Sequence, residues 1–267
     1  MKDILDKIKK FLVKYKRYLG VFGLFVVFVL VLVFFSGDEF NTKRIAKQNS
    51  IEVSGEDYVP DKEFEINAYP EINELIKEYF SAYVAADFAT LETLVTPLSK
   101  MEKSYITTMS QYYEEYKNIK CYTKHGLSKD SFIVSVFFDV KFTEQEVTAP
   151  SMLLFYVQTN KDGALYINNV YSDFNMKYRE TPVDNDVYTA LRKYTTQDDY
   201  LALFNKVEGE FSTLIRDNND IYQLTKRTIP STRQTWEDTV FYAESTEDVS
   251  GTESTESTTE TGTITAQ

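Results

Sequence analysis

The residue types best suited to nucleophilic or metal chemistry occur only once each in this chain. His125 is the single histidine and Cys121 the single cysteine. A Ser-His-Asp or Cys-His site would need His125, which stands beside Gly126 in a predicted turn and is interpreted as a solvated turn residue. Cys121 shares a predicted strand face with Ile119 and Thr123, which indicates a packed small residue rather than a nucleophile. One histidine and one cysteine cannot form a metal cluster.

Phosphate-binding chemistry has no support either. The nine glycines are scattered singly, so no glycine-rich phosphate loop is present. We therefore assign no catalytic, cofactor-binding or metal-binding residue and expect no cofactor.

The stretch from Leu19 to Phe35 organises the rest of the chain. It reads LGVFGLFVVFVLVLVFF, without a charge, and is long enough for one helix across the hydrocarbon core of a membrane. It is longer than the apolar region of a signal peptide and no A-x-A pattern follows it, which favours an uncleaved anchor over a secretory signal. No cysteine follows directly, so a lipid-modified amino terminus is excluded.

Charge predicts the orientation of this span. Residues 1–17 contain seven basic residues against Asp3 and Asp6, a pattern that keeps the amino terminus cytoplasmic. Removing this arm from the totals of 29 basic and 41 acidic residues leaves a net charge of −17, so nucleic-acid binding is not expected. The absence of a cysteine pair fits a bacterial surface better than an animal secretory route. We expect a single-pass protein of the cell membrane whose carboxyl-terminal domain is extracellular.

Three helices are predicted after a polar linker. Pro70 begins the first, in which apolar residues recur at three and four positions. Asp87 interrupts this pattern, and a short second helix then ends before Pro97. Ser99 and Glu102 form a capping-box signature for the third helix, to which Tyr112, Tyr113 and Tyr116 are also assigned. No strand is expected between the second and third helices.

After the third predicted helix, the spacing of apolar residues changes from the helical period of 3.6 residues to the strand period of 2. A strand with one wholly apolar face is predicted from Phe132 to Phe142, after a shorter strand from Ile119 to Lys124. Met152–Thr159 and Leu165–Val170 complete a four-stranded antiparallel meander, joined by the hairpin loop Asn160–Gly163.

Helices are predicted again towards the carboxyl terminus. A short helix around Val187, Leu191 and Tyr194 precedes a longer one from Asp198 to Asp217. The longer helix carries an apolar seam, defined as Tyr200, Phe204, Val207, Phe211 and Leu214. We expect the seam to dock on its own domain rather than on a second copy, because one contact then covers two apolar patches. Beyond Ala243 the Ser/Thr/Glu-rich tail is expected to be disordered.

This element order resembles the nuclear transport factor 2-like (cystatin-like) superfamily. The resemblance is carried by NELIKEYFSAYVAADFATLETLVTP, YYEEYKNIKCYTKHG, FIVSVFFDVKF and TAPSMLLFYVQTNKDGALYINN, and more weakly by DDYLALFNKVEGEF, over roughly residues 66–217. It is closer to extracytoplasmic domains of this type in single-span proteins of Gram-positive bacteria, mostly uncharacterised. It implies an α+β fold class, with a helix across the concave side of a curved sheet, as a cone-shaped domain.

The segments expected on this basis cover the chain except for residues 176–183. They are a basic cytoplasmic arm (1–17), a transmembrane helix (18–36), a juxtamembrane linker (37–67), the nuclear transport factor 2-like domain (68–175), carboxyl-terminal helices (184–228) and a linker with disordered tail (229–267).

The superfamily includes isomerases and dehydratases that use an acid and a base inside the cone. Asp139 is predicted to lie on the opposite face of its strand, which leaves Asp87 with Tyr83 one turn earlier as the best pair. A helix-terminating aspartate beside a core tyrosine explains both without catalysis. We therefore expect Asp87 to be exposed at a helix junction and the cone to be filled by Phe and Val.

Two functions from different classes follow from these observations. The first is a non-catalytic interaction or assembly module of the cell envelope with a protein partner, favoured by the apolar seam and the absence of reacting groups. The second is a small-molecule binder, or a lyase- or isomerase-type enzyme, that uses the interior of the cone. A homo-oligomer is compatible with the first function but is not favoured.

Overall fold

The structure, a computed structural model, describes residues 53–242. The chain divides into two compact units, residues 1–46 and 47–267, and the described residues belong to the second. The predicted basic arm, the predicted span over residues 18–36, most of the predicted linker and the predicted tail lie outside the described residues.

In chain order the elements are β1 (Glu65–Ile66), α3 (Pro70–Ala85), α4 (Phe88–Leu94), β2 (Val95–Thr96), α5 (Lys100–Met109), the 3₁₀ turn η2 (Ser110–Tyr112), β3 (Tyr113–His125), β4 (Ser131–Phe142), β5 (Thr148–Thr159), β6 (Leu165–Asn168), the 3₁₀ turn η3 (Asn169–Tyr171), α6 (Asp173–Tyr178), α7 (Asn185–Thr195), α8 (Asp198–Asp217), α9 (Asn219–Gln223), the π-helical turn η4 (Leu224–Thr228), α10 (Ile229–Trp236) and the π-helical turn η5 (Glu237–Phe241).

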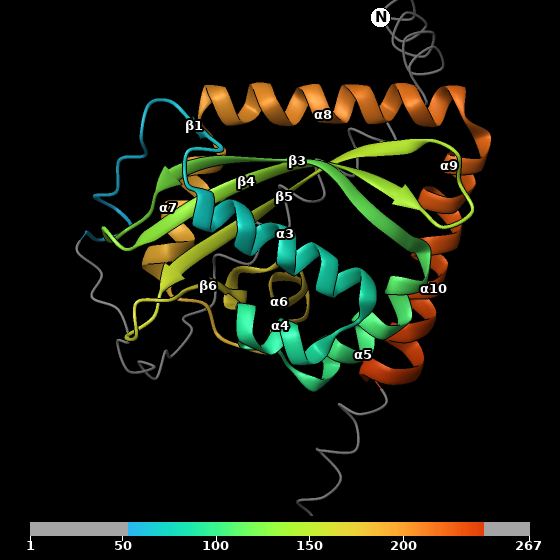
Figure 1. Ribbon diagram of the computed structural model, residues 1–267, viewed down its shortest axis with the longest axis horizontal. Coiled ribbons are helices and arrows are strands. Elements are labelled where there is room, and N and C mark those ends of the chain that lie inside the picture. The colour runs from blue at the N-terminus through green and yellow to red at the C-terminus, as the bar shows by residue number, and fades with distance from the viewer. Residues whose placement is uncertain (1–52, 243–267) are drawn as a thin grey trace, which may run out of the picture. The chain divides into compact units, whose positions relative to one another are not determined.

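A six-stranded sheet in the order β1-β3-β4-β5-β6-β2 forms the centre of the domain (Figure 1). Its neighbours are antiparallel except for β2 and β6, which run parallel. One side of β5 pairs with β4 from Thr148 to Gln158, whereas the other pairs with β6 only from Val157 to Thr159. Among the described residues, no strand therefore pairs with that second edge over residues 148–156.

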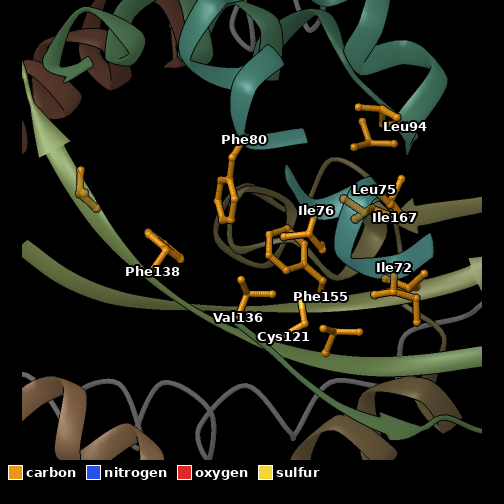
Figure 2. Packing of buried hydrophobic residues seen from close by; sticks show 14 of the residues in the cluster. Ile72, Leu75, Ile76, Phe80, Leu94, Cys121, Val136, Phe138, Phe155 and Ile167 are labelled. Carbon is orange, nitrogen blue, oxygen red and sulfur yellow. The ribbon is translucent and has the colours of Figure 1, made fainter. Parts of the chain in front are cut away.

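The helix α3 lies across one face of the sheet, and the main core fills the space between them (Figure 2). Pro70 lies in its first turn, as predicted, and the helix ends at Ala86, whose backbone is left-handed. Figure 2 shows Phe80 pointing from α3 towards the sheet, where its ring centroid is 4.7 Å from that of Phe138. Val136 is fully buried in the same cluster, so the predicted apolar face of β4 is confirmed as the inner face.

The other face of the sheet is covered by α7 and α8, and Figure 1 shows α8 running along the sheet. The seam of α8 is covered by its own domain. Phe211 and Leu214 pack against the main core, Tyr200 packs against the cluster around α7, and Val207 is buried. Self-docking of the seam, predicted from its apolar residues, is confirmed.

The predicted strand arrangement was wrong in three places. Glu65–Ile66 of the expected linker pairs with β3, and Val95–Thr96 forms β2 between the second and third helices, where no strand was expected. β3 begins at Tyr113, so Tyr113 and Tyr116 belong to the sheet and not to the third helix. The helices also continue to Phe241, past the expected end at residue 228.

The fold class is corrected accordingly. Within the described residues the domain is α+β with a mixed six-stranded sheet, in place of a four-stranded antiparallel one. No helix between residues 53 and 242 is long and apolar enough to cross a membrane. The transmembrane helix expected over residues 18–36 lies outside this part of the chain.

Candidate ligand-binding cavity

A cavity of about 490 Å³ lies between the carboxyl-terminal half of α3 and the elements α5, β3, β5, α6 and α10. It also extends around the open edge of β5, since residues 149–156 line it without interruption and residues of α8 line it from the far side. The expectation that Phe and Val fill the interior was therefore wrong. The polar side chains that line it include Tyr79, Tyr83, Glu102, Tyr105, Tyr113, Tyr116, Asp173 and Arg233.

Five aromatic residues form a closed circle of ring contacts on the wall of this cavity. We call Tyr79, Phe80, Tyr83, Tyr113 and Tyr116 the aromatic circle. The successive centroid distances are 5.9 Å for Tyr79–Tyr83, 6.4 Å for Tyr83–Tyr113, 5.9 Å for Tyr113–Tyr116, 4.5 Å for Tyr116–Phe80 and 5.6 Å for Phe80–Tyr79. These separations suit favourable aromatic pairs, so the circle is a firm apolar surface.

Backbone irregularity in β3 brings two of these rings to one face. The register of β3 against β4 shifts between Tyr113 and Glu115 and again between Lys117 and Lys120, and Asn118 has a φ of 52°. A bulge of this kind breaks the alternation of faces along a strand. Tyr113 and Tyr116, three positions apart, consequently both face α3 and pack against the main core.

The hydroxyl groups of the circle are the polar part of its surface. Within residues 53–242, Tyr79, Tyr83, Tyr113 and Tyr116 make no hydrogen bond through their hydroxyls, and none of these oxygens is sealed from solvent. Burial raises the pKa of each of them, to about 12 for Tyr113. Each hydroxyl therefore stays protonated and can both donate and accept a hydrogen bond to a molecule in the cavity.

Glu102 is a buried carboxyl group on the same wall, supplied by the first turn of α5. Its Oε2 accepts a hydrogen bond of 2.5 Å from Asn169 Nδ2, which also donates to the carbonyl of Pro97. Burial raises the pKa of Glu102 to about 7, against the opposing effect of the Asn169 hydrogen bond, and the negative charge of Glu180 adds to the rise. Its charge therefore changes near neutral pH.

Asp173 and Arg233 are the two other charged groups of interest. Asp173, in the first turn of α6, is exposed to solvent on the cavity wall, yet protein surrounds it closely enough for burial to raise its pKa. Arg233, from α10, is half-buried, and its Nε has no hydrogen-bond partner among residues 53–242. The Arg233 guanidinium interacts with the Tyr105 hydroxyl and lowers the pKa of Asp173 against the effect of burial.

A second aromatic cluster holds Arg233 in place. Trp236, the single tryptophan of the chain, follows it by one turn of α10 and packs its ring 5.1 Å from Tyr105 and 5.4 Å from Tyr178. Its Nε1 donates to the Ser104 hydroxyl at 3.0 Å. α10 is thereby fixed to both α5 and α6, which fixes one charged wall of the cavity.

The residues considered from sequence have other places. Asp87 is exposed at the junction of α3 and α4, as predicted, where it caps α4 by accepting from the Thr90 amide. Of the suggested pair, Tyr83 lines the cavity and Asp87 does not. Asp139 lies outside the cavity lining and accepts from Asn118 Nδ2 at 2.7 Å.

The single histidine and cysteine also lie away from the cavity. The His125 side chain is half exposed, and its Nδ1 lies 3.0 Å from Asp61 Oδ2. Cys121 is buried in the core, and burial raises the pKa of its thiol to about 11. Within the described part of the chain, no group of three His, Cys, Asp or Glu residues could hold a metal ion.

Sequence reasoning missed Glu102, Asp173 and Arg233 as cavity residues. Glu102 was noted only as a capping residue, and its amide does bond to the Ser99 hydroxyl as predicted. Asp173 and Arg233 lie in segments where apolar residues show no clear helical or strand spacing. They come together because α6 and α10 both pack against α5.

The chain matches no protein-family model, no curated protein and no solved structure. The resemblance to the nuclear transport factor 2-like superfamily therefore remains a prediction.

Proposed function

We propose that the domain formed by residues 53–242 binds a small organic molecule in the cavity between α3, α5, β3, β5, α6 and α10. The observation that carries the proposal is the aromatic circle, whose four tyrosines line a cavity of about 490 Å³ and have hydroxyls without hydrogen-bond partners in the described chain. Binding pockets combine such apolar walls with a few convergent polar groups. The bound molecule would supply the apolar contacts and hydrogen bonds that these groups lack.

The rival proposal, an interaction or assembly module, rested on an apolar seam that needed a partner. That seam is now covered by its own sheet, so the observation that favoured assembly no longer distinguishes the two functions. The cavity, in contrast, has aromatic walls and no covering segment among residues 53–242.

A neutral fluorescent probe tests the proposal. N-phenyl-1-naphthylamine should bind the full-length protein with one saturable site and a rise in fluorescence. Ser151 is half-buried on the open edge of β5 and lines the cavity, so Ser151→Phe should occupy the space and reduce probe affinity at least tenfold.

Ser212→Phe is the matched control, since Ser212 is exposed on α8 and outside the cavity lining. It should leave probe binding unchanged, and circular dichroism should show both variants folded. Absence of saturable binding, or equal binding by the two variants, would overturn the proposal.

A further inference from the structure

The cavity contains two opposite charges that are close but do not touch. Arg233 lowers the pKa of Asp173, so the two groups lie within electrostatic range. Among residues 53–242, however, no ion pair within 4.0 Å involves either of them. Of the other charged residues that line the cavity, Lys177 contacts Glu237 and Glu102 accepts from Asn169, whereas Glu208 of α8 has no ion pair within 4.0 Å among residues 53–242.

Two different helices, which pack on each other through Trp236, carry the two groups. Asp173 begins α6, where Ser172 caps the helix by accepting from the Asn175 amide at 3.3 Å. Arg233 is held by α10, through Trp236. The packing of α6 against α10 therefore sets the backbone positions of both groups, and Tyr105 contacts the Arg233 guanidinium.

A ligand with a single charge fits this pair poorly. A carboxylate placed at Arg233 would stand near the Asp173 carboxylate, and an ammonium group at Asp173 would stand near the Arg233 guanidinium. Like charges in a partly desolvated site repel strongly because screening by water is weak there. A dipolar ligand meets both groups favourably.

We infer that the cavity selects a zwitterionic ligand of the α-amino-acid type, with its ammonium group at Asp173, its carboxylate at Arg233 and its apolar side chain against the aromatic circle. The inference rests on the proposed function and specifies its ligand class. Charge-assisted hydrogen bonds at both ends would fix the orientation of the ligand, and the circle would supply the apolar contact.

Three probes with the same aromatic body test this. L-phenylalanine carries both charges, 3-phenylpropanoate only the negative one and 2-phenylethylamine only the positive one. Calorimetric titration of the full-length protein, with Trp236 emission as a second readout, should show L-phenylalanine binding at least tenfold more tightly than either other probe.

Two variants should change the order of affinity for the three probes in opposite directions. Asp173→Asn removes the negative charge and should weaken L-phenylalanine while strengthening 3-phenylpropanoate. Arg233→Gln should weaken L-phenylalanine and strengthen 2-phenylethylamine. Arg233→Lys keeps the charge and should retain part of the preference, which separates a charge effect from loss of folding.

The outcomes separate this inference from the proposed function. Equal binding of the three probes, or an order that neither variant changes, would overturn the inference while binding of N-phenyl-1-naphthylamine sustains the cavity. Binding of that neutral probe alone would also overturn it. Failure of all four probes would overturn both.

Discussion

Two polar clusters of this domain differ in whether their charges are paired. The first surrounds Lys124, which is 1% exposed. Its Nζ lies 2.6 Å from Asp199 Oδ2, donates to Gln197 Oε1 at 2.8 Å and stands 4.6 Å from the centre of the Phe64 ring. The second is the cavity cluster, where, among residues 53–242, Asp173 has no hydrogen bond or ion pair and Arg233 interacts with the Tyr105 hydroxyl and, electrostatically, with Glu237.

The difference is the one expected between a structural cluster and the proposed binding site. Lys124 joins β3 to the start of α8, and each of its contacts comes from the fold itself. If the cavity binds a ligand, as proposed, its unpaired charges should reduce the stability of the free protein, because sites arranged for a ligand commonly carry such a cost. Substitutions in the two clusters should therefore have opposite effects on the free energy of unfolding.

The largest effect is expected from a charge placed where the core has no cavity. Val136→Asp puts a carboxylate on the fully buried inner face of β4, at a cost of several kcal/mol against a total stability of roughly 5–15 kcal/mol. Circular dichroism should show an unfolded or strongly destabilised domain. Val147→Asp, at an exposed position, should melt like the wild type, and a well-folded Val136→Asp variant would contradict the assignment of the inner face.

The second-largest loss of stability is expected when the charge of Lys124 is removed from the paired cluster. Lys124→Met leaves Asp199 without its partner and should lower the free energy of unfolding by about 3 kcal/mol. Chemical denaturation measures this. Lys120→Met, on the exposed part of the same strand, is the control and should change stability by less than about 0.5 kcal/mol.

Glu102 should make stability depend on pH in an unusual direction. Its folded pKa, about 7, lies above its ordinary value of 4.5, so the folded state holds the proton more tightly. The stabilisation is complete below pH 4.5 and is lost as the pH rises through 7, amounting to about 3 kcal/mol at most. Glu102→Gln should remove this component of the pH profile measured by thermal melting, while Glu78→Gln on the exposed side of α3 should keep it.

The smallest change is expected at Asp173. Because burial disfavours its charged form, Asp173→Asn should lose no more than about 0.5 kcal/mol at pH 8, or should gain stability. The same substitution in the paired cluster, Asp199→Asn, should be destabilising in the same denaturation experiment. Equal losses in the two variants would remove the distinction between the clusters.

Local patterns in the sequence predict much of the fold. The start of α3 at Pro70, the cap of α5 at Ser99, the inner face of β4 and the full extent of α8 from Asp198 to Asp217 follow from capping residues and apolar spacing. These features depend on neighbours within a few residues. They carry no information on what lies opposite each element.

The errors have physical causes that a single sequence hides. Tyr113 and Tyr116 are three residues apart and mimic a helical stripe, whereas a bulged strand brings them to one face. The two-residue strands β1 and β2 are too short to show alternation. The cavity arises because large tyrosine rings pack against one another and not across the full space, a result of tertiary geometry alone.

The placement of Arg233 also bears on how the domain is synthesised. The last strand of the sheet ends at Asn168, whereas the cationic wall of the cavity comes from α10, close to the end of the described residues. Because a chain leaves the ribosome from its amino terminus, every strand is available long before Arg233 and Trp236 emerge. A chain terminated within α9 would have all the strands of this sheet but would lack the α10 side of the cavity.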